Sequence, residues 1–176
     1  MKLLSATAIA AAAALLAAGC AATPTPFDTA RATASLEPTK GNRATGTVTF
    51  VERMGKVHVS AEVSGLAPNQ EHGFHVHEKG DCSSGDGMSA GGHFNPDGKP
   101  HGPQTAPHHA GDMPSLRADA SGIAKASFAL DDVTVAAGPK SVVGRGLIVH
   151  KDPDDFKTQP TGNAGARLAC AVIRAA

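Results

Sequence analysis

Short runs of alternating apolar and polar residues constrain the fold of this chain more than any other feature. Residues 45–51 (TGTVTFV) and 56–63 (KVHVSAEV) alternate in this way on either side of a turn that contains Gly55. Alternation with a period of two is the pattern of a half-buried β-strand. Because no segment after the apolar N-terminal run has a persuasive 3.6-residue periodicity, the sequence predicts an all-β domain.

Further apolar runs indicate more strands, at residues 73–78, 116–120, 123–130, 141–150 and 167–173. Ser121 and Gly122 separate two of these runs and are a signal for a hairpin turn. Several short strands with turn signals between them predict a β-sandwich or β-barrel.

Two long segments, residues 80–114 and 151–166, have no regular pattern. The first is rich in Gly and Pro and holds four of the nine histidines. Loops of this length in a compact domain are usually functional or disordered. We expect a bound metal to organise them.

The histidines are spaced as metal ligands. His75 and His77 are two residues apart in a predicted strand and so project from the same face. The first long segment then holds three spaced histidines and an acidic residue, namely His93, His101, His109 and Asp112. Imidazole suits copper and zinc, and a carboxylate beside histidines suits zinc. Taken alone, His75 and His77 are better interpreted as half-buried strand histidines than as metal ligands. The loop residues taken alone are equally compatible with a metal site and with a solvated His-rich segment.

The N-terminus predicts export. Met1 and Lys2 precede an apolar run at residues 3–18 that has the length of a secretory signal and is too short for a transmembrane span. The run ends in LAAGC, which resembles the lipobox of bacterial lipoproteins, although Ala17 stands where leucine is commoner. We therefore expect a signal at residues 1–19 and a lipid on Cys20. A plain signal peptide cleaved near Ala18 is the alternative.

Residues 20–39 are rich in Ala, Thr and Pro and predict a lipidated tether, with the folded domain at residues 40–176. The chain has three cysteines. If Cys20 carries lipid, Cys82 and Cys170 are free to form a disulfide in an oxidising compartment. Net charge is zero and no basic block is present, so nucleic acid is not an expected partner.

Five segments together carry a family resemblance. They are GFHVHE (73–78), GHFNP (92–96), HAGD (109–112), VH (149–150) and GNAGARLAC (162–170), in that order. The chain resembles the copper,zinc superoxide dismutase family, in particular its exported bacterial members, from about residue 41 to residue 173. The resemblance implies a Greek-key β-barrel or sandwich of about eight antiparallel strands with two long functional loops.

The resemblance also implies a role for each site residue. Copper would be held by His75, His77, His93 and His150. Zinc would be held by His93, His101, His109 and Asp112, with the His93 ring bridging the two metals. Asp154 would hydrogen-bond one copper ligand and one zinc ligand, and Arg167 would attract the superoxide anion beside copper. His108 could compete with His109, whereas His58 and His72 are left as structural or surface residues.

The implied activity is dismutation of superoxide to oxygen and hydrogen peroxide, protecting the bacterial periplasm or cell envelope. Copper would change oxidation state in each half-reaction, while His93 leaves copper, takes up a proton and returns it. Pro160 stands where eukaryotic members carry a lysine, which leaves substrate steering beyond Arg167 open. Arg167 itself could instead be a surface arginine near the disulfide.

Two other functions are compatible with parts of the sequence. One is a copper-binding domain without activity, and the other is a surface lipoprotein that zinc merely stabilises. Both conflict with a complete set of copper-ligand positions. A homodimer is left open.

Overall fold

The structure is a computed structural model that describes residues 29–176. This part of the chain forms ten strands and one short 3₁₀-helix. The elements are β1 (Arg31–Pro38), β2 (Thr45–Arg53), β3 (Lys56–Ser64), β4 (Glu71–His72), β5 (Phe74–His77), η1 (Met88–Ala90), β6 (Leu116–Arg117), β7 (Ala124–Leu130), β8 (Gly146–His150), β9 (Arg167–Val172) and β10 (Arg174–Ala175). The predicted all-β fold class is confirmed.

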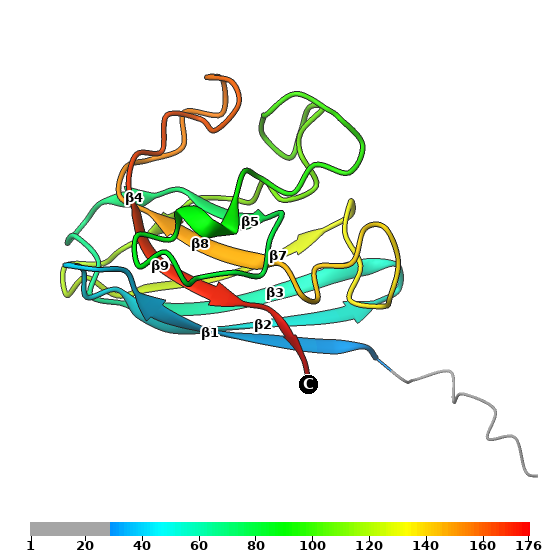
Figure 1. The fold of residues 1–176 in the computed structure, drawn as a ribbon, viewed down its shortest axis with the longest axis horizontal. Coiled ribbons are helices and arrows are strands. Elements are labelled where there is room, and N and C mark those ends of the chain that lie inside the picture. The colour runs from blue at the N-terminus through cyan, green and yellow to red at the C-terminus, as the bar shows by residue number, and fades with distance from the viewer. Residues whose placement is uncertain (1–28) are drawn as a thin grey trace, which may run out of the picture.

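Eight strands make one curled antiparallel sheet. Its order is β5-β8-β9-β1-β2-β3-β7, with β10 paired to β1. Figure 1 shows β1, β2 and β3 along one side of the molecule, while two long loops project from the side of β5 and β8. These loops are the segments that the sequence left without regular structure, and within the described chain the first contains only η1.

Burial along the strands explains where the site forms. In β3, buried and exposed residues alternate strictly, because one face packs on the core and the other meets water. In β5 and β8, every residue is buried. The inner face of β5 supplies Phe74 and Val76 to the core, and its outer face lies under the long loops, where polar side chains can be enclosed.

The expected tether is wrong at its C-terminal end, because residues 31–38 form strand β1. Ala32, Ala34 and Leu36 are buried in the core, and six residues of β1 pair with β2. The domain therefore begins before residue 40. The small side chains of this strand resemble a linker in composition, which hid its alternation.

The expected hairpin around Ser121 and Gly122 is also corrected. The turn is present, with the Gly122 amide donating to the Asp119 carbonyl over 3.0 Å. However, β6 pairs with β4 in a separate two-stranded sheet, and β7 pairs with β3. The turn signal was local, whereas strand pairing was decided by the rest of the sheet.

Candidate metal centre

Strand β5 and the loop that follows it position most of the site. Because side chains alternate along a strand, His75 and His77 face away from the core residues Phe74 and Val76. Two isolated bridges, His75 to Asp112 and His77 to His93, hold the long loop against the outer side of β5. The loop residues are thereby brought over the two strand histidines.

The first cluster consists of His75, His77, His93 and His150. All four residues are buried, and their nearest ring nitrogens lie within 4.8 Å of one another. The Nε2 atoms of His77 and His150 are 3.4 Å apart. This cluster joins β5, the end of β8 and the first long loop.

The second cluster consists of His93, His101, His109 and Asp112, again buried and within 4.8 Å. One carboxylate oxygen, Oδ1 of Asp112, lies 2.8 Å from His93 Nδ1, 3.0 Å from His101 Nδ1 and 3.4 Å from His109 Nδ1. Ligands about 2.0–2.1 Å from a tetrahedral zinc ion are about 3.3 Å from each other. The second cluster therefore has the dimensions of a tetrahedral zinc site.

Asp154 fixes one ring of each cluster. Its Oδ2 lies 2.7 Å from His75 Nε2, and its Oδ1 lies 2.9 Å from His101 Nε2. Because a carboxylate only accepts hydrogen bonds, both Nε2 atoms must carry a proton. The Nδ1 atoms of the neutral His75 and His101 rings are then bare and face the clusters, which is the arrangement that a metal requires.

Main-chain carbonyls orient two further rings in the same way. His77 Nδ1 donates to the Gly91 carbonyl over 2.9 Å, and His150 Nδ1 donates to the Gly165 carbonyl over 3.3 Å. Each bond leaves Nε2 bare, toward the first cluster. Four separate contacts thus select the metal-binding tautomer of four different histidines.

His93 belongs to both clusters. Its Nδ1 faces Asp112, while its Nε2 is buried and has no hydrogen-bond partner among the described residues. His75 Nδ1 is buried and unpartnered in the same way. Burying a polar nitrogen without a partner costs about 1–3 kcal/mol, and a cation in the first cluster removes that cost. The residues present therefore fit copper in the first cluster and zinc in the second.

The electrostatics agree with this assignment. Burial lowers the pKa of His75 to about 4 and holds the pKa values of His77 and His150 well below their usual range. These rings are neutral near pH 7, as metal ligands must be. Burial also lowers the pKa of His101, but hydrogen bonds that the ring donates to Asp112 and Asp154 outweigh it and raise that pKa to about 9. The two carboxylates thus favour positive charge at this position, and a metal ion that supplies this charge displaces the proton from His101 Nδ1.

Asp112 is held as a carboxylate. Burial alone would raise its pKa, but hydrogen bonds from His101 and His93 outweigh burial and hold the pKa far below its usual range. Its Oδ2 also accepts the main-chain N–H groups of Gly102 and His109, at 3.1 Å and 3.0 Å. Asp112 therefore supplies a fixed negative charge to the second cluster.

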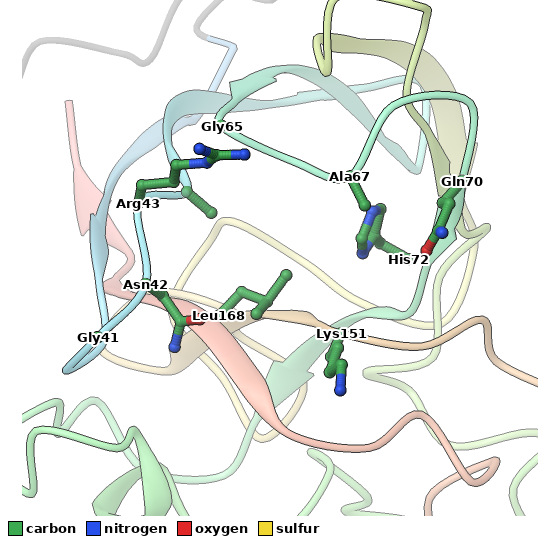
Figure 2. A pocket seen from close by; sticks show the side chains of 10 residues that line it. Gly41, Asn42, Arg43, Gly65, Ala67, Gln70, His72, Lys151 and Leu168 are labelled. Atoms are coloured by element: carbon green, nitrogen blue, oxygen red, sulfur yellow. The ribbon is translucent and has the colours of Figure 1, made fainter.

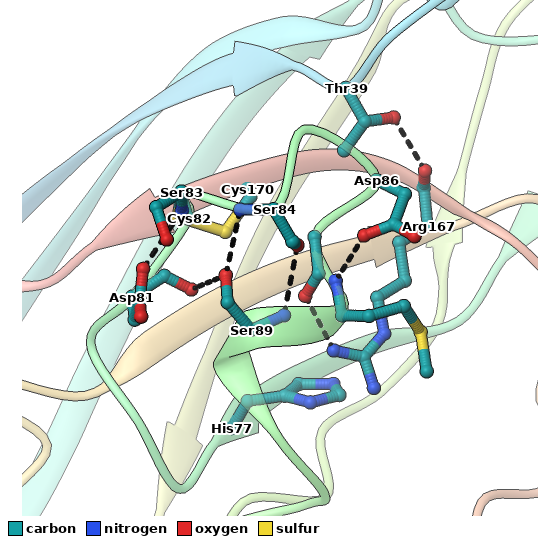
Figure 3. Close-up of a disulfide and its surroundings, with 12 residues drawn as sticks. Thr39, His77, Asp81, Cys82, Ser83, Ser84, Asp86, Ser89, Arg167 and Cys170 are labelled. Carbon is teal, nitrogen blue, oxygen red and sulfur yellow. Dashed lines mark hydrogen bonds between the residues drawn. A yellow bond between two sulfur atoms is a disulfide. The ribbon is translucent and has the colours of Figure 1, made fainter.

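Arg167 is fixed beside the first cluster (Figure 3). Its Nη1 donates to the Gly87 carbonyl and its Nη2 to the Gly91 carbonyl, each over 2.6 Å. The Gly91 carbonyl also accepts from His77, so one oxygen joins the guanidinium to a cluster ring. The predicted disulfide is present between Cys82 and Cys170. It ties the loop that carries η1 to the strand that carries Arg167.

The structure also shows a site residue that the sequence did not reveal. The Gln159 side chain accepts from the His101 main-chain N–H and donates to the His101 carbonyl, each over 2.8 Å. The second long loop thereby clamps a residue of the second cluster. Since the contacts are to the main chain, no pattern of residue types could have indicated them.

The remaining predicted residues lie as follows. His108 is outside both clusters, with Nδ1 donating to the Ala106 carbonyl over 2.7 Å, so the cluster contains His109 as expected. His58 is exposed on β3, whereas His72 is buried. Cys20 and the predicted signal lie outside the described residues. The assignment of each ligand to copper or zinc stays a prediction.

Comparison with known proteins decides the family. A family model described as copper/zinc superoxide dismutase (SODC) matches residues 44–173, most of the chain. The chain belongs to the copper/zinc superoxide dismutase family. It is 47% identical over 135 residues to "Superoxide dismutase [Cu-Zn]" of Paramecium bursaria Chlorella virus 1, covering 73% of this chain and 71% of that protein. It is 40% identical over 151 residues to "Superoxide dismutase [Cu-Zn] 2" of Aquifex aeolicus, covering 82% and 86%.

A solved structure agrees with the family. The crystal structure of the clock protein EA4 matches with a TM-score of 0.75 and 39% sequence identity, over 83% of this chain and 94% of that one. The family match confirms the expectation of an enzyme of the superoxide dismutase type. With the two clusters, it also confirms copper and zinc as the cofactors. Among the described residues, no helix has the length and apolar character needed to span a membrane.

Proposed function

We propose that this protein dismutates superoxide to oxygen and hydrogen peroxide at a copper site joined to a zinc site by His93. The observation that carries this proposal is the position of the His93 ring, with Nδ1 in one cluster and an unpartnered Nε2 in the other. Two curated relatives, from a chlorella virus and from Aquifex aeolicus, are named superoxide dismutases.

The two clusters support the ligand sets that the resemblance implies. His75, His77, His93 and His150 would hold copper, and His93, His101, His109 and Asp112 would hold zinc. When bound, copper supplies the one-electron redox chemistry, while zinc fixes the bridge and the loop. Asp154 orients His75 and His101 toward the two metals.

Two residues act on the substrate and its proton. Arg167 presents a permanent positive charge and a planar set of donors to a small anion, and two carbonyl bonds hold it beside His77. His93 Nε2 is the buried atom that takes up a proton in one half-reaction and returns it in the other. The protein thus contributes anion binding, orientation and a proton site.

The cell envelope is the proposed location. The N-terminal apolar run and LAAGC at residues 16–20 support cleavage before Cys20, its lipidation and attachment to a bacterial membrane facing the periplasm. The disulfide between Cys82 and Cys170 is compatible with an oxidising compartment. There the enzyme would remove superoxide that reaches the envelope.

The test of the activity is superoxide dismutation by the mature protein loaded with copper and zinc, with metal content measured on each sample. We expect fast, copper-dependent activity that falls about ten- to a hundredfold in Arg167→Ala at unchanged metal content. Arg174→Ala, an exposed arginine of β10, is the matched control and should keep full activity. Stoichiometric copper without activity would refute the proposal.

The location has a separate test. In a bacterial host, the wild-type chain should fractionate with membranes and incorporate labelled palmitate, whereas Cys20→Ser should be soluble and unlabelled. Equal labelling of the two proteins would exclude Cys20 as the anchor.

A further inference from the structure

A pocket is lined by residues that belong to neither metal cluster. It has a volume of about 430 Å³. The residues that line it come from the loop after β1, the loop before β4, the first residue after β8 and the start of β9. Figure 2 shows Arg43 and His72 on different sides of the opening, with Leu168 between them and Lys151 at the edge. This volume falls in the range of small-molecule sites, about 300–1,000 Å³.

The pocket is positively charged. Arg43 and Lys151 line it and form no ion pair among the described residues, and no acidic residue contributes to the lining. The nearest carboxylate in sequence to His72 is that of Glu71, which pairs with Arg117 over 3.0 Å. Lys151 is directed away from His72 in Figure 2, but its flexible stem lets the ammonium group turn toward a ligand. An anion is therefore the ligand that this charge pattern favours.

His72 adds a second, independent requirement. The residue is 1% exposed, and its Nδ1 donates to the main-chain carbonyl of His150 over 2.8 Å. In the neutral ring, Nε2 is then an acceptor, and this atom is buried without a hydrogen-bond partner among the described residues. Because an unsatisfied buried acceptor is costly, a ligand that donates a hydrogen bond to Nε2 is favoured over one that only accepts.

We propose that this pocket binds a small hydroxycarboxylate. Its carboxylate would meet the Arg43 guanidinium, with Lys151 as a second cation, and its hydroxyl would donate to His72 Nε2. Gln70, which forms no side-chain hydrogen bond to another described residue, could bond a remaining oxygen. The lining contains no residue of either metal cluster, although His72 bonds the main-chain carbonyl of His150, and the proposal does not depend on the dismutase activity.

L-malate and succinate form a matched pair of probes, because they differ only in the hydroxyl group. Each would be titrated into the isotope-labelled, zinc-loaded protein with reduced copper, while NMR follows the amides of Gly41, Arg43 and Gly65. We expect saturable shifts with malate and binding weaker by about three- to tenfold with succinate. Arg43→Gln and Lys151→Gln should each weaken malate binding by about the same factor. Lys125→Gln, which removes a cation paired with Glu62 outside the pocket, is the control.

Three results would overturn the proposal. They are the absence of saturable shifts at these amides, malate binding that Arg43→Gln leaves unchanged, and equal binding of malate and succinate. The last result would show that His72 takes no part. Because the readout is the pocket's own resonances, a failure of the proposed dismutase activity would leave this test intact.

Discussion

At the residue scale, the site depends on which nitrogen of each histidine carries the proton. Asp154 holds the protons of His75 and His101 on their outer nitrogens, at 2.7 Å and 2.9 Å. Main-chain carbonyls do the same for His77 and His150. For His75, His77 and His150, whose pKa values are lowered, these contacts prepare a bare nitrogen before any metal arrives, which reduces the cost of ordering the rings on binding. His101, whose pKa is raised, loses its Nδ1 proton when the metal binds.

Replacing Asp154 tests this arrangement. Asn cannot accept from both rings at once, so Asp154→Asn should release His75 or His101 from its metal-binding tautomer. We expect copper or zinc affinity to fall by about ten- to a hundredfold, measured by competition with chelators. Asp155→Asn changes an adjacent exposed carboxylate that bonds only within its own loop, to Lys157 and Thr158, and should leave both affinities intact. Unchanged affinities in Asp154→Asn would show that the rings need no such partner.

At the element scale, the two long loops are joined across the second cluster. Gln159 binds both the N–H and the carbonyl of His101. The loop of residues 151–166 thereby holds a ligand from the loop of residues 80–114, and Asp154 joins the same two loops through His101. Neither loop has a strand of its own, so these contacts add to the two isolated bridges and the disulfide that already hold the first loop.

Removing the clamp should weaken zinc binding more than folding. Two main-chain hydrogen bonds contribute about 1–3 kcal/mol together, so Gln159→Ala should speed zinc release by about ten- to a hundredfold. The measurement is the rate of zinc transfer to a chromogenic chelator. Lys157→Ala in the same loop should release zinc at the wild-type rate. If the two variants behave alike, the clamp does not hold the zinc ligand.

Strand β1 shows what the sequence could and could not predict about the elements. Strands β2 and β3 were predictable, because apolar and polar residues alternate clearly there. In β1, Ala32 and Ala34 give the alternation little contrast, and Pro38 suggests a linker. The pairing of β6 with β4 spans two residues on each strand, too few to leave a pattern.

Stability measurements can test the place of β1 in the domain. Leu36 is 1% exposed in the core, so Leu36→Ala should lower the free energy of unfolding by about 2–5 kcal/mol. Thr33→Ala, on the exposed side of the same strand, should change it by less than about 0.5 kcal/mol. Denaturant unfolding of the two variants gives the comparison. If both variants change the free energy of unfolding by the same small amount, residues 31–38 are not part of the core, and the tether interpretation is favoured.

At the scale of the whole molecule, the curled sheet carries the two long loops, and the disulfide between Cys82 and Cys170 ties the first loop to β9. The metal ligands were predictable, because their spacing and order match the family. The resemblance also implied that Asp154 bonds one ligand of each metal. The carbonyl contacts that orient His77 and His150, the Gln159 clamp and the pocket at His72 were not predictable, since they depend on contacts between segments far apart in the chain. Cys20 and the location remain predictions from the sequence.

The central claim is that His93 joins a copper site and a zinc site. Crystals of the copper- and zinc-loaded protein, measured at the absorption edges of both metals, test it directly. The account predicts a copper peak among His75, His77 and His150, a zinc peak among His101, His109 and Asp112, and the His93 ring between them. The account would be contradicted if copper were missing from the first group. It would also be contradicted if, in the oxidised enzyme, the His93 ring contacted just one of the two metals.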